Sequence, residues 1–348
     1  MMRALLLLSA LAAPAAAQQP PLPPAGAAAW TYDVNGGAPG EWASSIGAFN
    51  ARAKTPLSLI FSYGGDMEWY PGTPSPYQTY FPPESQAALA VYNATPGVVQ
   101  VIAVIDGRMD GGESYSPDLS KLSDGELRAW AAETAALYCS VDAVDGIQLD
   151  LEPFTGKYKA PFLAFLGYLA ADLRSAERNC VDPRHPAGRS ITTFMFAESA
   201  TAEVWAALGP GGFLTVSGYD LSGAPAGVPS AVADYAAALA ASLAAVAASA
   251  RASNGSYFVG IPAAASAHEF ASYTLANGTV IEGHPQSDYL RAALAALAAD
   301  AQGLPGYLGA SLWGFAPDMA YPPHSDNTFA PGNPFVEAGE EELLATSL

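Results

Sequence analysis

The chain has 348 residues, of which 51% are hydrophobic and 14% are charged, so it can bury a large core and is not an intrinsically disordered protein. Its formal net charge of −19 opposes binding to nucleic acid and to anionic membranes. A neutral or cationic polymer remains compatible with this charge.

Residues 1–17 have the features of a secretory signal peptide. Arg3 supplies the positive start, four leucines at 5–8 form the apolar centre, and three alanines at 15–17 form a small-residue cleavage site. We therefore expect a secreted, extracellular protein; an uncleaved N-terminal anchor is the alternative. The apolar run is too short to span a membrane, and we expect no membrane span elsewhere.

Strand-like and helix-like segments alternate along the rest of the chain. A Pro-rich linker over residues 18–27 is expected to be extended and mobile. Eight strands are predicted, over residues 30–34, 57–63, 98–105, 146–152, 190–196, 214–219, 257–261 and 309–315. Helices are predicted over residues 123–139, 162–178, 230–251 and 287–301, and the first of them opens on the capping box Ser123 to Glu126.

This alternation predicts an α/β fold, a single (β/α)8 TIM barrel over residues 28–335 with an acidic tail over residues 336–348.

The segment 145–153, DGIQLDLEP, carries the strongest functional pattern. At strand spacing, Gln148, Asp150 and Glu152 lie on one face and three aliphatic residues lie on the other. Because a buried, unpartnered carboxylate costs several kcal/mol, two of them on one strand face indicate a use. Inside a barrel they would point toward the C-terminal mouth, roughly 6–7 Å apart along the strand. Repulsion at that distance favours a proton on one of them, as a general acid requires. An edge strand with a solvated polar face is the alternative.

The same segment resembles the fourth-strand DxxDxDxE motif of glycoside hydrolase family 18, with Gln148 in place of the middle Asp. Residues 217–220, SGYD, resemble the family's sixth-strand MxYD, with Ser217 in place of Met. Residues 260–262, GIP, resemble its seventh-strand GLP turn, and Trp313 resembles its eighth-strand Trp. The third-strand SxGG motif is degenerate around Asp106 and Gly107. The resemblance covers residues 30–318. One subgroup of the family carries a large α+β insertion that walls a deep groove, and the segment 262–285, between the seventh strand and the next helix, is too short for it. The resemblance therefore implies a single barrel without this insertion and with an open, shallow cleft.

The resemblance implies a retaining, substrate-assisted glycosidase that is chitinase-like and cleaves polymers or glycans containing β-1,4-linked N-acetylglucosamine. Glu152 would protonate the leaving glycosidic oxygen. Asp150 and the hydroxyl of Tyr219 would orient the substrate's acetamido group as it attacks the anomeric carbon. Trp313 would stack under the distorted sugar, and Asp220 would hydrogen-bond it.

Three further residues are expected to bind substrate. Tyr63 ends the second strand, and Trp69 belongs to the aromatic-rich loop over residues 64–83, whose rings could equally pack on one another. Gln148 is expected to hold Asp150 by a hydrogen bond. Because Gln148 cannot ionise, we expect a modest rate and an acid-shifted pH optimum.

Two other functions stay open. A chitinase-like lectin that binds sugar without hydrolysis fits Gln148, and a lysozyme-like muramidase fits the Asp-x-Glu pattern at a fourth strand. Under each function the partner is a carbohydrate containing N-acetylglucosamine, and we expect a monomer. The histidines are scattered and no HExxH motif occurs, so no metal and no cofactor are predicted.

Cys139 and Cys180 are plausible disulfide partners in a secreted protein. Both fall at the ends of predicted helices, just before the next strand, which places them on the same lower face of a barrel. Two free buried thiols are the alternative.

Overall fold

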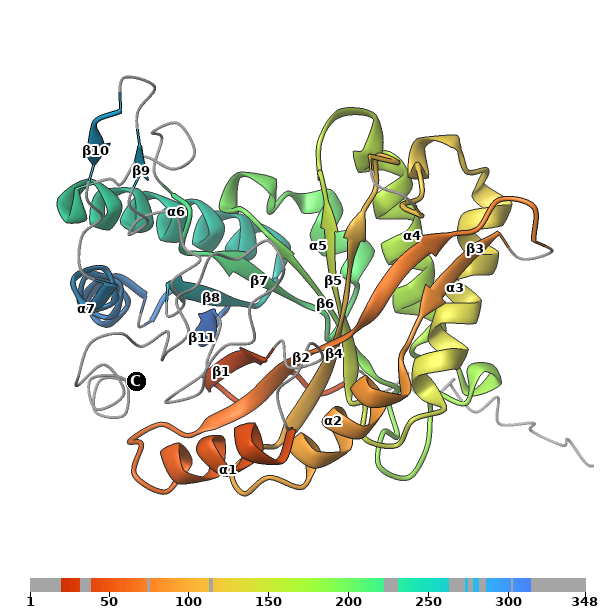
Figure 1. Ribbon diagram of the computed structural model, residues 1–348, viewed down its shortest axis with the longest axis horizontal. Helices are drawn as coiled ribbons and strands as arrows, with labels where there is room; N and C mark the ends of the chain where they lie inside the picture. The colour runs from red at the N-terminus through yellow and green to blue at the C-terminus, as the bar shows by residue number, and fades with distance from the viewer. Residues whose placement is uncertain are drawn as a thin grey trace, which may run out of the picture.

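Eight parallel strands form the centre of the molecule and close into a barrel (Figure 1). The computed structural model describes residues 20–31, 39–73, 76–112, 115–221, 231–262, 273–274, 278–281, 286–301 and 303–313. The barrel strands are β1 (Gly26–Thr31), β2 (Leu57–Trp69), β4 (Gln100–Arg108), β5 (Gly146–Glu152), β6 (Ser190–Met195), β7 (Phe213–Ser217), β8 (Tyr257–Pro262) and β11 (Tyr307–Trp313). Because β1 pairs in parallel with both β2 and β11, the barrel has no free edge. The predicted (β/α)8 barrel is confirmed.

Helices connect successive barrel strands and cover the outside of the barrel (Figure 1). They are α1 (Pro39–Asn50), α2 (Pro83–Asn93), α3 (Asp124–Cys139), α4 (Lys159–Asp172), α5 (Ala202–Leu208), α6 (Val232–Ser253) and α7 (Gln286–Ala296), which a π-helical turn at Leu297–Ala301 extends. In the part of the chain that the structure describes, three short strands lie outside the barrel: β3 (Tyr77–Tyr80), which pairs antiparallel with β2, and the antiparallel pair β9 (Tyr273–Thr274) and β10 (Val280–Ile281). The predicted capping box is present at the start of α3.

Several predicted boundaries are wrong. The first strand starts at Gly26, within the predicted linker, and not at residue 30. The linker is also packed in part, since Pro20 and Pro23 are buried. Pro20 crosses so close to Gly211 that a Cβ there would lie 2.5 Å from the Pro20 carbonyl oxygen. The predicted signal peptide and acidic tail lie outside the described residues.

The interior of the barrel is apolar at its lower and middle levels. On β4, Ile102 and Val104 point inward, while Val101, Ala103 and Ile105 pack against the outer helices. The other inward residues of this cluster are Ala28, Trp30, Leu59, Phe61, Phe213 and Phe258. The same alternation turns Asp106, the next even residue of β4, toward the barrel axis.

Helix α6 is long and apolar enough to cross a membrane, judged by length and composition alone. Here it packs between α5 and α7 on the outside of the barrel (Figure 1). Its buried residues recur at helical spacing, from Tyr235 through Leu239 and Leu243 to Val246 and Ala250. The Tyr235 hydroxyl also donates to the Gly218 carbonyl at 2.7 Å. The apolar composition of α6 is thus used for packing in the fold.

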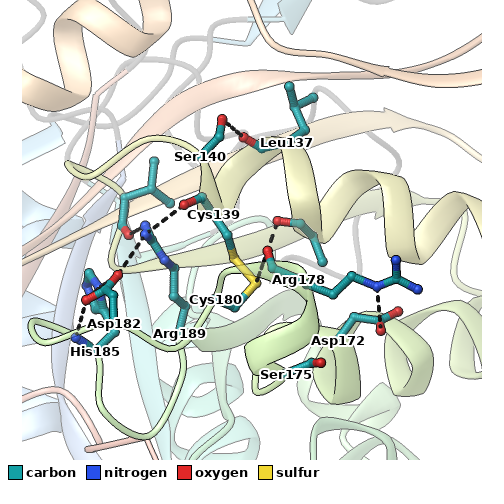
Figure 2. Close-up of a disulfide and its surroundings, with 12 residues drawn as sticks. Leu137, Cys139, Ser140, Asp172, Ser175, Arg178, Cys180, Asp182, His185 and Arg189 are labelled. Carbon is teal, nitrogen blue, oxygen red and sulfur yellow. Dashed lines mark hydrogen bonds and ion pairs between the residues drawn. A yellow bond between two sulfur atoms is a disulfide. The ribbon is translucent and has the colours of Figure 1, made fainter.

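A disulfide and a buried polar cluster hold the lower end of the barrel (Figure 2). Cys139, the last residue of α3, is bonded to Cys180, as predicted. Beside the bond, the buried guanidinium of Arg189 donates to the carbonyls of Cys139, Val141 and Val144 and to the carboxylate of Asp182. These bonds tie the end of α3 to the chain that leads into β6.

The first acid of the predicted motif belongs to this lower cluster. Asp145 accepts the backbone N–H of Val101 at 2.7 Å and contacts Nε2 of His185 at 2.9 Å. A guanidinium nitrogen of Arg184 lies 2.7 Å from the same carboxylate. Asp145 therefore anchors the start of β5, at the opposite end of the strand from Glu152.

Candidate active site

A pocket of about 380 Å³ lies where the barrel strands end. It contains five of the predicted site residues: Asp150, Glu152, Tyr219, Asp220 and Trp313. The other lining residues are Asp66, Asp106, Gly107, Arg108, Phe194 and Phe196. A larger hollow of about 870 Å³ lies at the other end of the barrel, near Pro20 and Gly211, but its described lining residues include no acid or base. Of these two hollows, the one at the C-terminal mouth therefore holds the acidic and basic lining residues.

Three carboxylates lie side by side on neighbouring strands at this mouth. In the register of the sheet, Asp66 on β2 is the partner of Asp106 on β4, and Asp106 is the partner of Asp150 on β5. Neighbouring strands are about 4.8 Å apart, so the acids form a row across the pocket wall. Glu152 lies one step higher on the same face of β5 and is exposed at the rim. The three carboxylates therefore concentrate negative charge next to Glu152, the acid best placed to donate a proton to a bound molecule.

A bulge at Gly64 brings Asp66 into this row. Tyr63 pairs with Val104 and Gly65 pairs with Ile105, so Gly64 is an extra residue that exchanges the two faces of β2. A Cβ on Gly64 would lie 2.7 Å from that of Ala103. Gly65 has φ +135°, and a Cβ there would lie 1.7 Å from the Tyr80 carbonyl oxygen. This backbone requires glycine at both positions.

The predicted site residue Tyr63 lies beneath the pocket and does not line it. Its hydroxyl donates to the Asp66 carboxylate. Burial, this hydrogen bond and the charges of Asp66 and Asp106 raise the pKa of Tyr63 far above its usual value. Tyr63 therefore stays a neutral donor and positions Asp66, and a direct contact between Tyr63 and sugar stays a prediction.

Trp69, also predicted to bind substrate, is not among the described lining residues of the pocket. Asp66 faces the pocket, so the strand alternation turns Trp69 to the opposite face of β2. Its register partner Tyr77 stacks on Trp130 of α3, with ring centroids 5.6 Å apart. Trp69 is 38% exposed, but on the side of the hairpin that faces α3.

Gln148 is fully buried, which corrects the prediction that it binds substrate. The indole N–H of Trp30 donates to its Oε1 at 2.7 Å, and its Nε2 donates to the Thr215 hydroxyl at 2.9 Å. Within the described part of the chain, neither hydrogen bond goes to Asp150, so the predicted tie between the two is also wrong. Because an indole N–H can only donate, it fixes which way the Gln148 amide points. Gln148 therefore holds Trp30 and leaves Asp150 to other partners.

Stacked aromatic rings form the apolar wall of the pocket. Tyr219 stacks on Trp313 at 5.3 Å and 17°, and on Phe194 at 5.9 Å and 19°. Trp30 supports Trp313 from below in an edge contact, with centroids 5.5 Å apart. By accepting the Trp30 hydrogen bond, Gln148 orients the ring that supports Trp313. A ring wall of this kind suits the C–H face of a sugar.

A tight turn after β7 presents Tyr219 and Asp220 to the pocket. The Ser217 hydroxyl donates to the Tyr219 carbonyl at 2.6 Å and accepts its N–H at 3.3 Å. Gly218 passes so close to β8 that a Cβ would lie 2.2 Å from the Gly260 carbonyl oxygen. Asp220 has φ +56°, a conformation that Asp tolerates better than most residues.

The pocket is strongly negative. Its carboxylates come from Asp66, Asp106, Asp150, Glu152 and Asp220, and Arg108 is the one basic residue among the described lining residues. The Arg108 guanidinium also pairs with Asp110 at 2.7 Å, outside the pocket. An anionic ligand would be repelled, whereas a neutral or cationic sugar would be accepted. Among the residues that the structure describes, no group of three or more His, Cys, Asp or Glu is arranged to hold a metal ion.

Sequence comparison finds no matching family model and no matching curated protein. Comparison of structures finds chitinases and chitinase-like proteins of glycoside hydrolase family 18. Human YKL-39, a pseudo-chitinase with retained chitooligosaccharide binding, matches with TM-score 0.51 and 10% identity over 83% of this chain and 92% of that one. The family 18 chitinase ChiB of Flavobacterium johnsoniae matches with TM-score 0.50 and 12% identity over 84% and 88%. A chitinase-like agglutinin of Robinia pseudoacacia matches with TM-score 0.51 and 13% identity over 83% and 94%.

These matches establish that the chain has the fold of family 18 chitinases and chitinase-like proteins. At such low identity the likeness concerns the fold alone. The functional argument therefore rests on the residues at the mouth of this barrel.

Sequence reasoning missed Asp66 and Asp106. Asp66 followed a Gly-Gly pair within a segment interpreted as a loop, and Asp106 was counted only as part of a degenerate motif. A signal for Asp106 was present, since it continues the even-residue alternation of Ile102 and Val104 at the end of β4.

Proposed function

We propose that this protein is a secreted glycosidase that cleaves glycans containing β-1,4-linked N-acetylglucosamine, with Glu152 as the general acid. The observation that carries the proposal is the single pocket in which Asp150 and Glu152 face the stacked pair Tyr219 and Trp313. Carboxylates and a sugar-sized aromatic wall are the two requirements of glycoside hydrolysis. The signal-like segment 1–17 supports secretion.

In this mechanism the sugar ring lies against Trp313, and Glu152 at the rim protonates the glycosidic oxygen as the bond to the anomeric carbon breaks. The acetamido oxygen of the same sugar attacks that carbon and forms a cyclic intermediate. Asp150, one strand step deeper, accepts the acetamido N–H and balances the positive charge that develops. Water then opens the intermediate while Glu152, now ionised, takes the water's proton, and the anomeric configuration is retained.

Tyr219 assists by position. Its ring is held between Phe194 and Trp313, so its hydroxyl has little freedom to move when substrate binds. A preorganised donor of this kind favours the transition state, because it need not reorient during the reaction.

A carbohydrate-binding lectin is the second candidate, and Gln148 is the observation that favours it. The side chain in the row beneath Asp150 is an amide committed to Trp30 and Thr215, so it cannot exchange a proton with Asp150. A human pseudo-chitinase and a plant chitinase-like agglutinin are among the proteins of this fold. Such a protein would keep the ring wall and bind sugar without turnover.

Incubation with chitooligosaccharides, N-glycopeptides and peptidoglycan, with the products identified by mass spectrometry, separates these functions. We expect cleavage of the N-acetylglucosamine chains by the parent and a loss of at least a hundredfold in turnover for Glu152→Gln. Binding of the uncleaved oligosaccharide should stay within a few-fold, because the acid acts in the transition state.

Three outcomes would change the conclusion. Binding without cleavage by the parent identifies a lectin, and cleavage of peptidoglycan alone identifies a muramidase. Turnover of Glu152→Gln within a few-fold of the parent would remove Glu152 from the mechanism.

A further inference from the structure

The β2–β3 hairpin extends one wall of the pocket beyond the barrel. After Asp66, β2 leaves its barrel neighbours and continues to Trp69, paired antiparallel with β3. Figure 1 shows this hairpin in orange, lying along α3. The hairpin presents one face to α3 and the other face to the side on which the pocket opens.

Register assigns its residues to the two faces, because directly opposed residues in an antiparallel pair share a face. Tyr77 and Thr79 contact α3: Tyr77 stacks on Trp130, and the Thr79 hydroxyl hydrogen-bonds to that of Thr134 at 2.7 Å. The other face carries Asp66 with its partner Tyr80, and Glu68 with its partner Gln78. Since Asp66 lines the pocket, this second face continues the pocket wall.

Tyr80 is held in place but open to solvent. The next residue, Phe81, is buried and stacks on Tyr138 of α3, with centroids 4.2 Å apart and 13° between the planes. The bulge glycine Gly65 packs directly under the Tyr80 carbonyl. The Tyr80 side chain nevertheless remains 47% exposed. A rigidly supported aromatic residue that stays uncovered opposite a pocket-lining residue, here Asp66, is a typical ligand contact.

We propose that Tyr80 is a second sugar-binding platform, so that the protein favours oligosaccharides long enough to reach from the pocket to the hairpin. The inference rests on the proposed function, because it assumes a sugar chain in the pocket. The ring would pack against the C–H face of a pyranose. Gln78 and Glu68, on the same face, offer an amide and a carboxylate to its hydroxyl groups. Tyr70 holds Glu68 in place by a hydrogen bond of 2.6 Å.

The test compares kcat/KM on N-acetylglucosamine oligomers from dimer to hexamer. Tyr80→Ala should lower kcat/KM about three- to tenfold on the longest oligomers, the size of one aromatic contact, and leave the shortest cleaved oligomer unchanged. Tyr80→Phe keeps the ring and should match the parent. Trp69→Ala is the matched control, because it removes an exposed aromatic ring from the opposite face of the same hairpin. Tyr80→Thr keeps strand propensity and replaces the alanine variant if that variant does not fold.

Two results would overturn the inference while the proposed function stands: a Tyr80 effect that is equal at every length or absent, or the same length-dependent loss in Trp69→Ala. If the parent binds these oligomers without cleaving them, calorimetric affinities replace kcat/KM, and the same dependence on length is expected. If the parent neither cleaves nor binds any of them, both the proposed function and this inference are wrong.

Discussion

Replacing Gln148 by Glu places a carboxylate under the candidate active-site pocket without changing the shape of the side chain. Trp30 can still donate its indole N–H to the new carboxylate. The Thr215 hydroxyl, which accepts from Gln148, can turn and donate instead. The charge is therefore introduced with two hydrogen-bond donors in place, although burying it costs some stability.

The size of the effect follows from the spacing of β5. Position 148 lies two residues from Asp150 and four from Glu152, roughly 6.6 and 13 Å along the strand. With an effective dielectric constant of about 20, the repulsion is about 2.5 kcal/mol at the nearer position and about 1.3 kcal/mol at the farther one. Because Glu152 is exposed, solvent reduces the second figure. The introduced charge should therefore keep the acid protonated to a pH higher by about half a unit to one unit.

The assay is the pH dependence of kcat/KM on a chitooligosaccharide, with folding checked by thermal melting. We expect the basic limb of the profile to move upward in Gln148→Glu, and Gln148→Asp, which restores the acid of the family pattern, to move it in the same direction with higher turnover. Gln148→Met is the neutral control and should leave the limb in place. A folded, active Gln148→Glu variant whose basic limb coincides with the parent's would refute the electrostatic reasoning.

Two predictions concern the lower end of the barrel. Replacing both Cys139 and Cys180 by Ala removes a bond that closes a loop with a sequence separation of 41 residues, so the free energy of unfolding in denaturant should fall by about 3–4 kcal/mol; an unchanged midpoint would mean that the bond contributes nothing. Burial opposes ionisation of Asp182, but the side chain and backbone N–H of His185 lower its pKa to about 2. Because the pKa of Asp182 is lower in the folded chain than in the unfolded chain, its ionised form stabilises the fold at any pH above the unfolded-state pKa. This contribution, at most about 2 kcal/mol, is lost as pH falls from about 4 toward 2. The melting temperature of Asp182→Asn should therefore fall less than that of the parent between about pH 4 and pH 2. An equal fall in parent and variant would contradict this role of Asp182.

Strand β5 is predicted with its observed bounds because its signals are local. Glycine is its first residue, proline follows it, and polar and aliphatic residues alternate between them. Helices α1, α2 and α5 were missed for equally local reasons. Helix α2 begins at Pro83, and a proline pair favours a loop assignment unless the helix start is recognised. Helix α5 has seven residues, too few for a periodic pattern to emerge.

Which side chains line the site depends on contacts between residues far apart in the sequence, and no local pattern predicts these contacts. Gln148 faces inward as its strand alternation predicts, but its partners lie 118 and 67 residues away in the chain. The faces of β2 after Gly64 could be assigned only once its pairing with β4 was known, which is why Asp66 was missed and why Trp69 could not be assigned to the face that looks toward α3. Composition and alternation therefore predicted the barrel and the two acids of β5, whereas packing decided which other side chains line the pocket.

Strand β5 carries an anchor at one end and the proposed proton donor at the other, and this limits which mutations the strand can accept. Asp145 exchanges backbone and side-chain hydrogen bonds with Val101 and receives the backbone N–H of Ser190, so its position relative to both neighbouring strands is fixed. A codon inserted or deleted between Gly146 and Leu151 would turn the acids above it outward while Asp145 stayed in place. Descendants of this gene can therefore vary the strand by substitution alone, and changes of length are confined to the loops.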